Sequence, residues 1–420
     1  MSKRSIGILL LLAIVGFYTF GTGFTFFSRF FYALILLLPL GFGWAWLGLR
    51  GIDVQLVRSA SRGQVGGYLE GRIRLRNHTR LPKSWLEVVE VTDLPDPSSG
   101  RGLTMLGRQD RIWRSDTYLS RRGVYRTGQV EVASQDPFGL FRLRRRFLNP
   151  QSYTVLPAAH PLPDLDPFLA SLPSDGRVMR HWDHITTDVA SIRHYSDGDS
   201  YRRIHWPYTA RMNTLMVKEF DLGLSAESWV VLDMEAGVHV GAAADPVVNT
   251  EEVAVTVAAS LISRLADFSL PVGLAASGDP SFIHRPNSSP DYPRKLMETL
   301  AVVRASGATS LERFLYDLRP SFSRFNTLTV ITPSTHREWV QALSNLRRKG
   351  VSVSAVLIDP LGFSYAASID PVLHALIANE VPSYVVRRGQ NLNEALHSSL
   401  TRWPTTGGSA IGEMASEAAR

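Results

Sequence analysis

Two long apolar stretches at the N-terminus limit the fold of this chain more than any other feature. They cover residues 6–27 and 30–49, and the only charged residue within or between them is Arg29. Each stretch is about as long as the roughly 20 helical residues that cross a hydrocarbon core. A cleaved signal peptide is the alternative, but no small-x-small pattern closes the first stretch and a second follows directly. We therefore expect residues 1–50 to form a transmembrane helical hairpin.

Basic residues predict the orientation of this hairpin. Lys3 and Arg4 precede the first helix, and Arg50, Arg58 and Arg62 follow the second. Flanking segments that carry Lys and Arg stay on the cytoplasmic side of a membrane, so both ends of the hairpin are expected there. The sequence thus predicts a two-pass protein of the inner (cytoplasmic) membrane, with its soluble domains in the cytoplasm.

The remainder of the chain has the composition of globular domains. Hydrophobic residues make up 45% of the 420 residues, which is ordinary for chains with buried cores and gives room for two or three domains. The absence of cysteine excludes disulfides, thiolate metal sites and cysteine nucleophiles. A net charge of +7 indicates an anionic neighbour, which the inner leaflet provides. Basic and aromatic residues do not follow one predicted helix, so we expect no nucleic-acid partner.

Period-two alternation predicts a β-sandwich-like domain over residues 51–157. Apolar and polar residues alternate over residues 69–76, which is the pattern of a half-buried strand. Three further segments repeat the pattern more loosely, with turn residues between them: 85–91, 124–132 and 141–147. In the last segment Arg142, Arg144 and Arg146 share one face. A solvated strand face explains these arginines more simply than an anion-binding patch does.

Alternating strands and helices predict an α/β doubly wound sheet over residues 226–400. Residues 228–234 form a continuous apolar run that contains an acid near its end, which is typical of a buried parallel strand. Residues 245–268 have an apolar face at helical spacing, and Thr250 is expected to cap that helix. Further strands are expected at 271–276, 327–332, 351–358 and 383–387, and helices at 292–304, 311–318 and 336–349. No Gly-rich phosphate loop follows a strand, so we expect no nucleotide site.

Composition also marks the segments between and beyond these domains. Residues 158–192 are rich in proline and are expected to form a linker. Residues 401–420 are rich in small and polar residues and are expected to form a flexible tail. Between the linker and the sheet, residues 193–225 hold an unusual density of Arg, Tyr, His and Trp, with a short strand expected at 215–217.

Motifs in three places resemble the domain-of-unknown-function 58 family of bacterial proteins. Residues 121–125 are Arg-Arg-Gly-Val-Tyr, residues 136–141 are Asp-Pro-Phe-Gly-Leu-Phe, and residues 193–225 hold a long family signature. The signature matches at Arg193, Tyr195, Gly198, Asp199, Arg202, Ile204, His205, Trp206, Thr209, Ala210, Arg211, Leu215, Val217, Lys218 and Glu219. The resemblance covers essentially the whole chain. It implies a membrane-anchored protein with a von Willebrand factor type A-like α/β domain and a MoxR-type AAA+ ATPase as partner.

The same resemblance implies a place for a metal ion. In metal-binding von Willebrand factor type A domains, an Asp-x-Ser-x-Ser motif ends the first strand, and a Thr and an Asp from later loops complete the site. Here the motif is Asp233-Met-Glu235-Ala-Gly237, Pro333 stands where the later Asp is expected, and Thr309 is the candidate threonine. Asp233 and Glu235 are therefore the candidate ligands of a degenerate site. Mg²⁺ would suit such oxygen ligands, although we expect no cofactor and regard backbone capping by Asp233 as the simpler role.

The signature segment, residues 193–225, also allows a catalytic interpretation. Its Asp199, His205, Lys218 and Glu219 are acid, base or metal-ligand types, but neither a His-x-His nor a His-x-x-x-His spacing supports a metal. Arginines and acids alternate in the segment, a pattern that favours ion pairs in a domain joint or a docking surface: Arg202, Arg203 and Arg211 with Asp197, Asp199, Glu219 and Asp221. We expect no catalytic residue. Interaction roles are assigned to Arg193, Tyr195, Gly198, Asp199, Arg202, His205, Trp206, Thr209, Arg211, Lys218 and Glu219.

These features predict a non-enzymatic, membrane-anchored cytoplasmic scaffold or adaptor. The resemblance implies that it works with a MoxR-type AAA+ ATPase in the assembly or maturation of protein complexes. A metal-dependent protein-binding module with a degenerate metal site is one alternative. A hydrolase of the cell envelope is another, although the sequence holds no nucleophile motif and no external domain. The client and the oligomeric state do not follow from the sequence.

Overall fold

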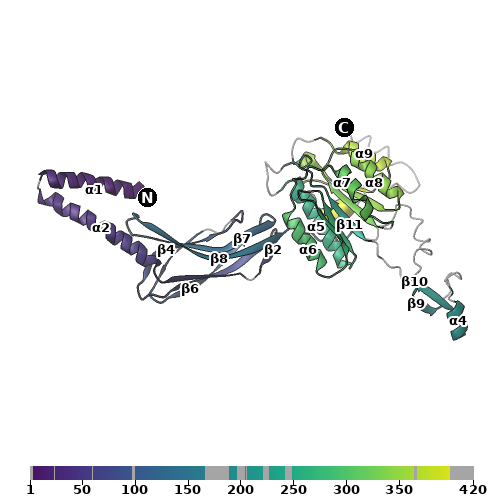
Figure 1. Cartoon of the computed structure of the whole chain (residues 1–420), viewed down its shortest axis with the longest axis horizontal. Coiled ribbons are helices and arrows are strands. Elements are labelled where there is room, and N and C mark those ends of the chain that lie inside the picture. The colour runs from purple at the N-terminus through teal and green to yellow at the C-terminus, as the bar shows by residue number, and fades with distance from the viewer. Residues whose placement is uncertain are drawn as a thin grey trace. The chain divides into compact units, whose positions relative to one another are not determined.

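The chain forms two compact units, Met1–Pro157 and Ala158–Arg420. A computed structural model describes residues 3–22, 24–58, 60–96, 100–165, 189–195, 204, 206–220, 227–241, 248–324, 326–363 and 367–397. The first unit holds two helices and a set of long strands, and the second holds an α/β sheet with helices on both faces (Figure 1).

The N-terminal helices are α1 (Lys3–Thr22) and α2 (Thr25–Leu49). Aromatic rings join them, with the ring centroids of Tyr18 and Phe27 5.6 Å apart and those of Phe20 and Phe31 6.0 Å apart. Helix α2 is long and apolar enough to cross a membrane, and α1 contains a shorter apolar stretch, Leu10–Gly21. Both predicted helices are therefore present, and α2 has the length of a span.

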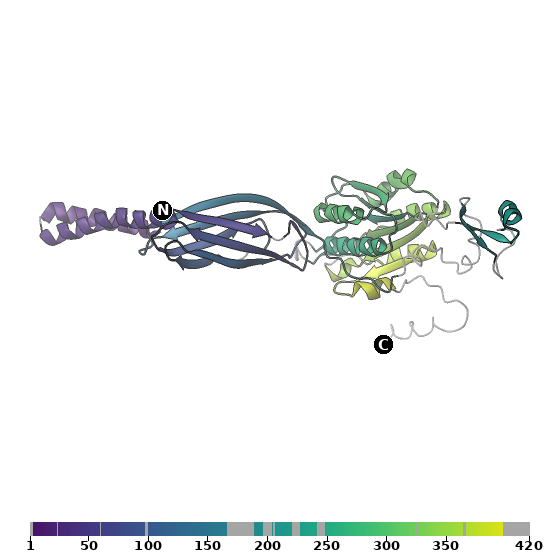
Figure 2. The ribbon, with the colours of Figure 1, turned by 90° about the horizontal axis from the view of Figure 1, so that it is seen from below.

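Two sheets make up the rest of the first unit. Their strands are β1 (Ile52–Arg58), β2 (Arg62–Gln64), β3 (Tyr68–Asn77), β4 (Lys83–Val91), β5 (Arg101–Met105), β6 (Asp110–Tyr118), β7 (Gly123–Gln135) and β8 (Arg142–Leu156). One sheet has the order β1-β3-β6 and the other β2-β8-β7-β4-β5. Ile73 and Leu75 of the first sheet share a buried core with Leu86 and Val132 of the second, so the sheets pack face to face (Figure 2).

Strand β3 shows why the sequence specifies this packing. Its residues alternate between exposed and buried along all ten positions, as the sequence pattern predicted. On β8, acids of β7 and β4 in the same sheet neutralise the arginine face. Arg144 and Arg146 lie 3.2 and 3.0 Å from the carboxylate oxygens of Glu131, and Arg142 bonds Glu87. The arginine face is thus paired within its own sheet, in keeping with a solvated strand face.

The second unit is built on a six-stranded mixed sheet. Its strands are β11 (Ser228–Leu232), β12 (Val272–Ala276), β13 (Phe282–Asn287), β14 (Thr327–Thr332), β15 (Ser352–Ile358) and β16 (Ser383–Val386), in the order β13-β12-β11-β14-β15-β16. All neighbours are parallel except β13, which pairs antiparallel with β12 at the edge. The predicted strands are confirmed, and β13 is an addition that makes the sheet mixed.

Helices cover both faces of this sheet (Figure 1). One face carries α5 (Thr250–Asp267), α6 (Tyr292–Val302) and α10 (Leu392–His397), and the other α7 (Leu311–Leu318), α8 (Glu338–Arg348) and α9 (Asp370–Ala378). Strand β11 sits between the two cores, because Val230 and Leu232 belong to the first and Trp229 and Val231 to the second. A strand buried on both faces explains the continuous apolar run in the sequence.

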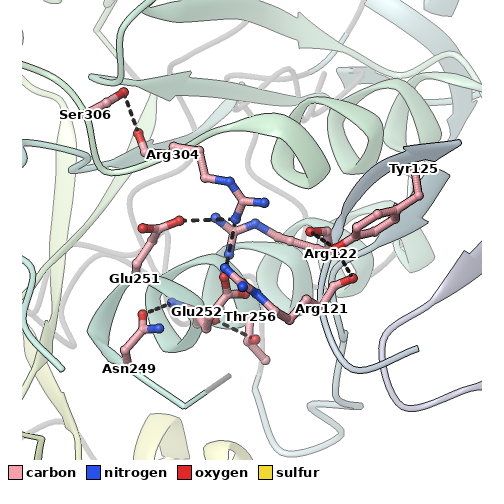
Figure 3. Close-up of polar contacts among 9 residues, drawn as sticks. All are labelled: Arg121, Arg122, Tyr125, Asn249, Glu251, Glu252, Thr256, Arg304 and Ser306. Atoms are coloured by element: carbon pink, nitrogen blue, oxygen red, sulfur yellow. Dashed lines mark hydrogen bonds and ion pairs between the residues drawn. The ribbon is translucent and has the colours of Figure 1, made fainter. Parts of the chain in front are cut away.

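The start of α5 differs from the prediction by one residue (Figure 3). Asn249, not Thr250, is the N-cap: its backbone is extended, and its side-chain oxygen accepts a hydrogen bond of 3.1 Å from the Glu252 backbone nitrogen. Thr250 is fully buried and bonds the Val240 backbone instead. Arg304 lies 3.5 Å from both Glu251 and Glu252, which places acids at the positive end of the helix.

The first residues of the proline-rich segment pack against α5. The His160 backbone nitrogen donates to the Ser260 hydroxyl at 2.9 Å, and Leu162 is buried in the core on the α5 face. Arg264 donates to the carbonyls of Pro163 and Leu165 at 2.9 and 3.2 Å. Residues 166–188 of the predicted linker and the predicted tail, 401–420, lie outside the described residues.

Candidate functional site

The family signature segment forms a small element of its own. Strands β9 (Val189–His194) and β10 (Met216–Phe220) pair antiparallel, with Arg193 opposite Val217, and α4 (Trp206–Met212) lies between them in the chain. The Tyr195 backbone nitrogen donates to the Leu215 carbonyl at 2.9 Å, and Ile204 forms a β-bridge with Val217. The predicted strand at 215–217 is thus confirmed with a shift of one residue at its start.

Thr209 anchors the helix of this element to its strand. The Thr209 hydroxyl accepts a hydrogen bond of 3.0 Å from the Met216 backbone nitrogen. No residue of α4 is buried, and Trp206 at its first position is 63% exposed. Arg211 is exposed in the last turn of the same helix. The element therefore presents an aromatic and a basic side chain on a short helix.

The structure brings together only part of the predicted signature set. Arg193, Lys218 and Glu219 lie on the paired strands β9 and β10, and Tyr195 follows β9 directly. Several predicted residues lie outside the described part of the chain: Asp197, Gly198, Asp199, Arg202, Arg203, His205 and Asp221. The ion pairs expected among them therefore stay a prediction.

The two family motifs of the sandwich close turns. Both the Arg121 and the Arg122 carbonyl lie within hydrogen-bond distance of the Tyr125 hydroxyl, at 3.0 and 3.2 Å (Figure 3). In the second motif, the buried Asp136 carboxylate accepts from the backbone nitrogens of Phe138 and Phe141 at 2.9 and 2.6 Å. The Tyr125 hydroxyl and the Asp136 carboxylate are therefore engaged by local backbone, which is a structural role.

A second group of polar side chains gathers at the carboxyl edge of the six-stranded sheet. Asp233 directly follows β11 and is fully buried. Its Oδ2 accepts a 2.6 Å hydrogen bond from the Thr332 hydroxyl at the end of β14. Its Oδ1 accepts from the Glu235 backbone nitrogen at 3.1 Å and from the Ser277 hydroxyl at 3.5 Å. One carboxylate thus ties the ends of three neighbouring strands, and its bond to Glu235 is the backbone capping that the sequence favoured.

Burial dominates the ionisation of this carboxyl group. Removal from water raises the pKa of Asp233 to about 6, although the hydrogen bonds from Thr332 and Glu235 favour the charged form and lower it. A carboxylate that is held charged at neutral pH in a buried place is costly, and three donors reduce that cost. The arrangement therefore fixes the loop that follows β11.

His239 extends the network towards α5. Its Nε2 lies 2.8 Å from the Asp233 carbonyl oxygen, and its Nδ1 lies 3.3 Å from the Thr250 hydroxyl. Since a carbonyl oxygen only accepts, Nε2 carries the proton of this bond. The loop 233–241 is therefore held at both of its ends.

The edge has the position of a ligand site in α/β folds. The chain runs from β11 to β12 on one side and later returns to β14 on the other, so the strand order reverses beside Asp233. Crevices at such reversals, outside the carboxyl ends of the strands, are the usual binding places. In the described residues, however, no three His, Asp or Glu side chains group as metal ligands.

The oxygen atoms at this edge only partly fit a cation. Both Asp233 oxygens already accept hydrogen bonds, Glu235 is half-buried, and Thr309 is exposed. Ser277 and Thr332 supply the nearby hydroxyls, and no sequence pattern predicted a role for them. The one feature of the sequence that could have identified them is their position: each lies at or directly after the end of a strand beside β11.

Known structures resemble parts of this chain weakly. One is a complex of zinc 2-glycoprotein and prolactin inducible protein from human seminal plasma, with 8% identity, a TM-score of 0.21, and coverage of 26% of this chain and 97% of the other. Another is the pilus adhesin SpaC from Lactobacillus rhamnosus GG, with 8% identity, a TM-score of 0.31, and coverage of 41% and 29%. At these scores the fold is established by the strands and helices above and not by likeness.

Sequence comparison is more specific. The chain is 24% identical over 131 residues to the uncharacterized protein YeaD of Bacillus subtilis (strain 168), a match that covers 31% of this chain and 30% of YeaD. The chain thus spans less than a third of this relative's length. Residues 191–363, which include the signature segment and the carboxyl edge of the sheet as far as β15, match the model of the family described as protein of unknown function DUF58. Over these residues the chain is similar to the DUF58 family, and the signature motif lies within the match.

Proposed function

We propose that this protein is a membrane-anchored adaptor that docks a protein partner through its signature segment. The observation that carries the proposal is the exposure of α4, where no residue is buried and Trp206 is 63% exposed. An exposed tryptophan keeps a large apolar surface in contact with water, which is unfavourable. Tryptophan is also the residue type most enriched in the hot spots of protein–protein interfaces. Arg211 on the same helix adds a second residue type of such centres.

The carboxyl edge of the sheet supports a binding role over acid–base catalysis. Both oxygens of the Asp233 carboxylate are engaged by Thr332, Ser277 and the Glu235 backbone. A general base needs an oxygen within reach of a substrate proton, and Asp233 is fully buried. Asp233 instead holds three loops in place, which suits a rigid presenting surface. The strand order and this polar edge also support the proposal of a von Willebrand factor type A-like fold.

The membrane part of the proposal rests on the N-terminal helices. Helix α2 has the length and apolar character of a span, and α1 contacts it through stacked and edge-on rings. We propose that both cross the membrane and that the basic residues on either side keep both units in the cytoplasm. The family resemblance supplies the class of partner, a MoxR-type AAA+ ATPase, and a role in the assembly or maturation of protein complexes.

Co-purification with a matched variant tests this proposal. The full-length tagged protein is extracted in several detergents, and proteins that co-purify are identified by mass spectrometry. Trp206→Ala should lower the yield of the ATPase at least severalfold, whereas Tyr316→Ala, which removes an equally exposed aromatic ring (63%) from α7, should not. Absence of any ATPase across all detergents would contradict the proposed partner. Equal yields from both variants would remove Trp206 from the docking surface.

A metal-dependent binding module is the second candidate. It is favoured by the oxygens that meet at the carboxyl edge, from Asp233, Glu235, Ser277 and Thr332. Mg²⁺ prefers such hard oxygen ligands. Titration calorimetry of the full-length protein with Mg²⁺ and Mn²⁺ should then show a heat that Asp233→Ala abolishes. Identical traces for the two proteins would exclude this site.

A further inference from the structure

The end of the sandwich next to α2 is a closed set of loops. They join β3 to β4 (residues 78–82), β5 to β6 (106–109) and β7 to β8 (136–141). The Asn77 side-chain nitrogen donates to the carbonyls of Leu81 and Leu106, at 2.9 Å each, and the Arg108 backbone nitrogen donates to the Thr79 carbonyl at 2.8 Å. The first two loops are thus held together as one surface.

Helix α2 runs directly onto this surface. The Lys83 ammonium, on a residue only 1% exposed, donates to the carbonyls of Leu47 and Arg50, the latter at 3.0 Å. Those carbonyls lie at the C-terminal end of the helix, where the backbone lacks partners and favours a cation. Desolvation, and then the charge of Arg50, lowers the pKa of Lys83. The buried cation therefore fixes the end of α2 to the start of β4.

Two glycines bring α2 close to the strands. A Cβ atom on Gly48 would lie 2.0 Å from the Ser134 hydroxyl oxygen, and one on Gly41 would lie 3.3 Å from the Phe141 ring. The ring of Phe42 meets that of Phe141 edge-on, with centroids 5.8 Å apart. The turn 136–141 therefore lies beside α2 about two helical turns before the helix ends.

Helix length places this turn at the depth of a membrane surface. About 20 helical residues cross a hydrocarbon core, so a span that begins at Thr25 ends near Trp44. Gly41, which faces the turn, lies three residues inside that limit, or about 4.5 Å at the helical rise of about 1.5 Å per residue. If α2 spans the bilayer, the loops at this end lie at the level of the lipid headgroups.

The side chains of these loops match that depth. Four large apolar residues at this end are exposed: Leu81 (51%), Trp85 (68%), Leu106 (69%) and Phe138 (57%). Arg80 and Arg108 are exposed among them, and neither belongs to an ion pair within the described residues. Apolar tips interleaved with arginines are the composition of surfaces that bind anionic membranes.

The backbone of Trp85 is independent evidence that the exposed apolar side chains at this end have a role. Its backbone φ is 60°, in the left-handed region that a bulky residue rarely adopts. The pairing of β4 with β5 shifts register between Lys83 and Leu86, so a β-bulge surrounds Trp85. A bulge re-aims side chains, and here Lys83 is buried under α2 while Trp85 is exposed. The strained backbone thus holds a tryptophan out of the core.

We propose that this end of the sandwich is a lipid-contacting surface, which inserts Leu81, Trp85, Leu106 and Phe138 among headgroups and binds anionic phospholipids through Arg80 and Arg108. The inference rests on the proposed membrane anchoring by α2 and goes beyond it, because an anchor alone leaves the sandwich free of the bilayer. The sandwich would then be seated on the membrane, and not tethered at a distance from it.

The absence of cysteine makes a direct test possible. Single cysteines at Leu36, Leu106, Phe138 and Tyr68 carry a fluorophore in the full-length protein, reconstituted in nanodiscs that contain nitroxide-labelled lipid. Leu36 lies on α2 and reports anchoring. Tyr68 is 65% exposed at the opposite end of β3 from Asn77 and is the matched control. We expect strong quenching at Leu36, clear quenching at Leu106 and Phe138, and none at Tyr68.

The outcomes separate the two proposals. Loss of quenching at Leu36 would overturn the anchoring itself, whereas quenching at Leu36 alone would overturn only the lipid-contacting surface. Anionic phosphatidylglycerol should increase the quenching at Leu106 over that in phosphatidylcholine, and Arg80→Gln with Arg108→Gln should abolish the increase. Equal quenching in both lipids would overturn anionic recognition. Energy transfer between labelled copies without lipid quenching would assign the surface to a second copy of the chain and overturn the proposal.

Discussion

Replacing Asp233 by asparagine should change how the stability of the second unit depends on pH. Burial raises the pKa of this carboxyl group to about 6 from an ordinary 3.8. Between these values the folded protein binds a proton that the unfolded chain has lost, so the free energy of unfolding falls as pH rises. Well below the lower pKa, the folded and unfolded states both hold the proton. Well above the upper pKa, the fall in the free energy of unfolding is complete.

The size of the effect follows from the same two values. Each pKa unit corresponds to about 1.4 kcal/mol, so a shift of about two units lowers the free energy of unfolding of the wild-type protein by about 3 kcal/mol between pH 3 and pH 7. The asparagine of the Asp233→Asn variant does not titrate, and its altered hydrogen bonds to Thr332 and Glu235 add an offset that does not vary with pH. Other carboxyl groups contribute equally to both proteins. The difference between the two pH profiles therefore isolates Asp233.

Pulse labelling measures this difference in the full-length protein. Each protein is equilibrated in detergent with increasing urea at several pH values, then exposed briefly to deuterium at one common pH. Mass spectrometry of peptides from β11 and α5 gives the folded fraction of the second unit at each condition. We expect the wild-type profile to fall by about 3 kcal/mol relative to Asp233→Asn between pH 3 and pH 7. Parallel profiles would refute the burial argument for this carboxylate.

Two substitutions test the junction of α2 with the sandwich. Gly48→Ala should destabilise the first unit by about 1–3 kcal/mol, because its Cβ would lie 2.0 Å from the Ser134 hydroxyl oxygen, and Ser134→Ala should relieve much of that loss. Gly43→Ala is the control, since no atom lies within 4 Å of its Cβ position, and an equal effect at both glycines would contradict the packing. Lys83→Met should cost about 2 kcal/mol, because the last carbonyls of α2 lose a charged donor inside the protein. Urea unfolding in detergent, read from β4 and β7 peptides, checks both substitutions. A Lys83→Met protein as stable as the wild type would contradict this role of the ammonium.

The sequence specified those elements whose burial follows a regular period. Strand β3 alternates strictly, and β11 is apolar throughout, so both were predicted. Strand β6 was missed because polar residues occupy its inward positions: Ser115 and Thr117 are buried at 6% and 1% exposure. Strand β13 was missed because it contains Arg285 and Pro286, which central strands avoid and an edge strand tolerates.

The candidate site shows the same limit. Asp233 was predictable because an acid directly after a buried strand marks the carboxyl edge of a sheet. Its partners Ser277 and Thr332 stand 44 and 99 residues away in the chain, and their hydroxyls reach Asp233 only because β12 and β14 flank β11. Strand order is a tertiary property, and no local pattern around Ser277 or Thr332 encodes it.

Lys83 and Asp233 show how buried charge is used in this protein. Each lies at the end of a regular element. Burial lowers the pKa of Lys83 and raises the pKa of Asp233, and both shifts favour the neutral form of the side chain. Apolar residues of similar size would avoid that desolvation cost, but they would leave the polar groups that these charges meet without partners. An apolar residue cannot form directional hydrogen bonds. Here the ammonium donates to the last carbonyls of α2, and the carboxylate accepts from donors at the ends of β12 and β14 and in its own loop. Both charges therefore fix geometry, one where the sandwich meets the proposed membrane anchor and one at the carboxyl edge of the sheet.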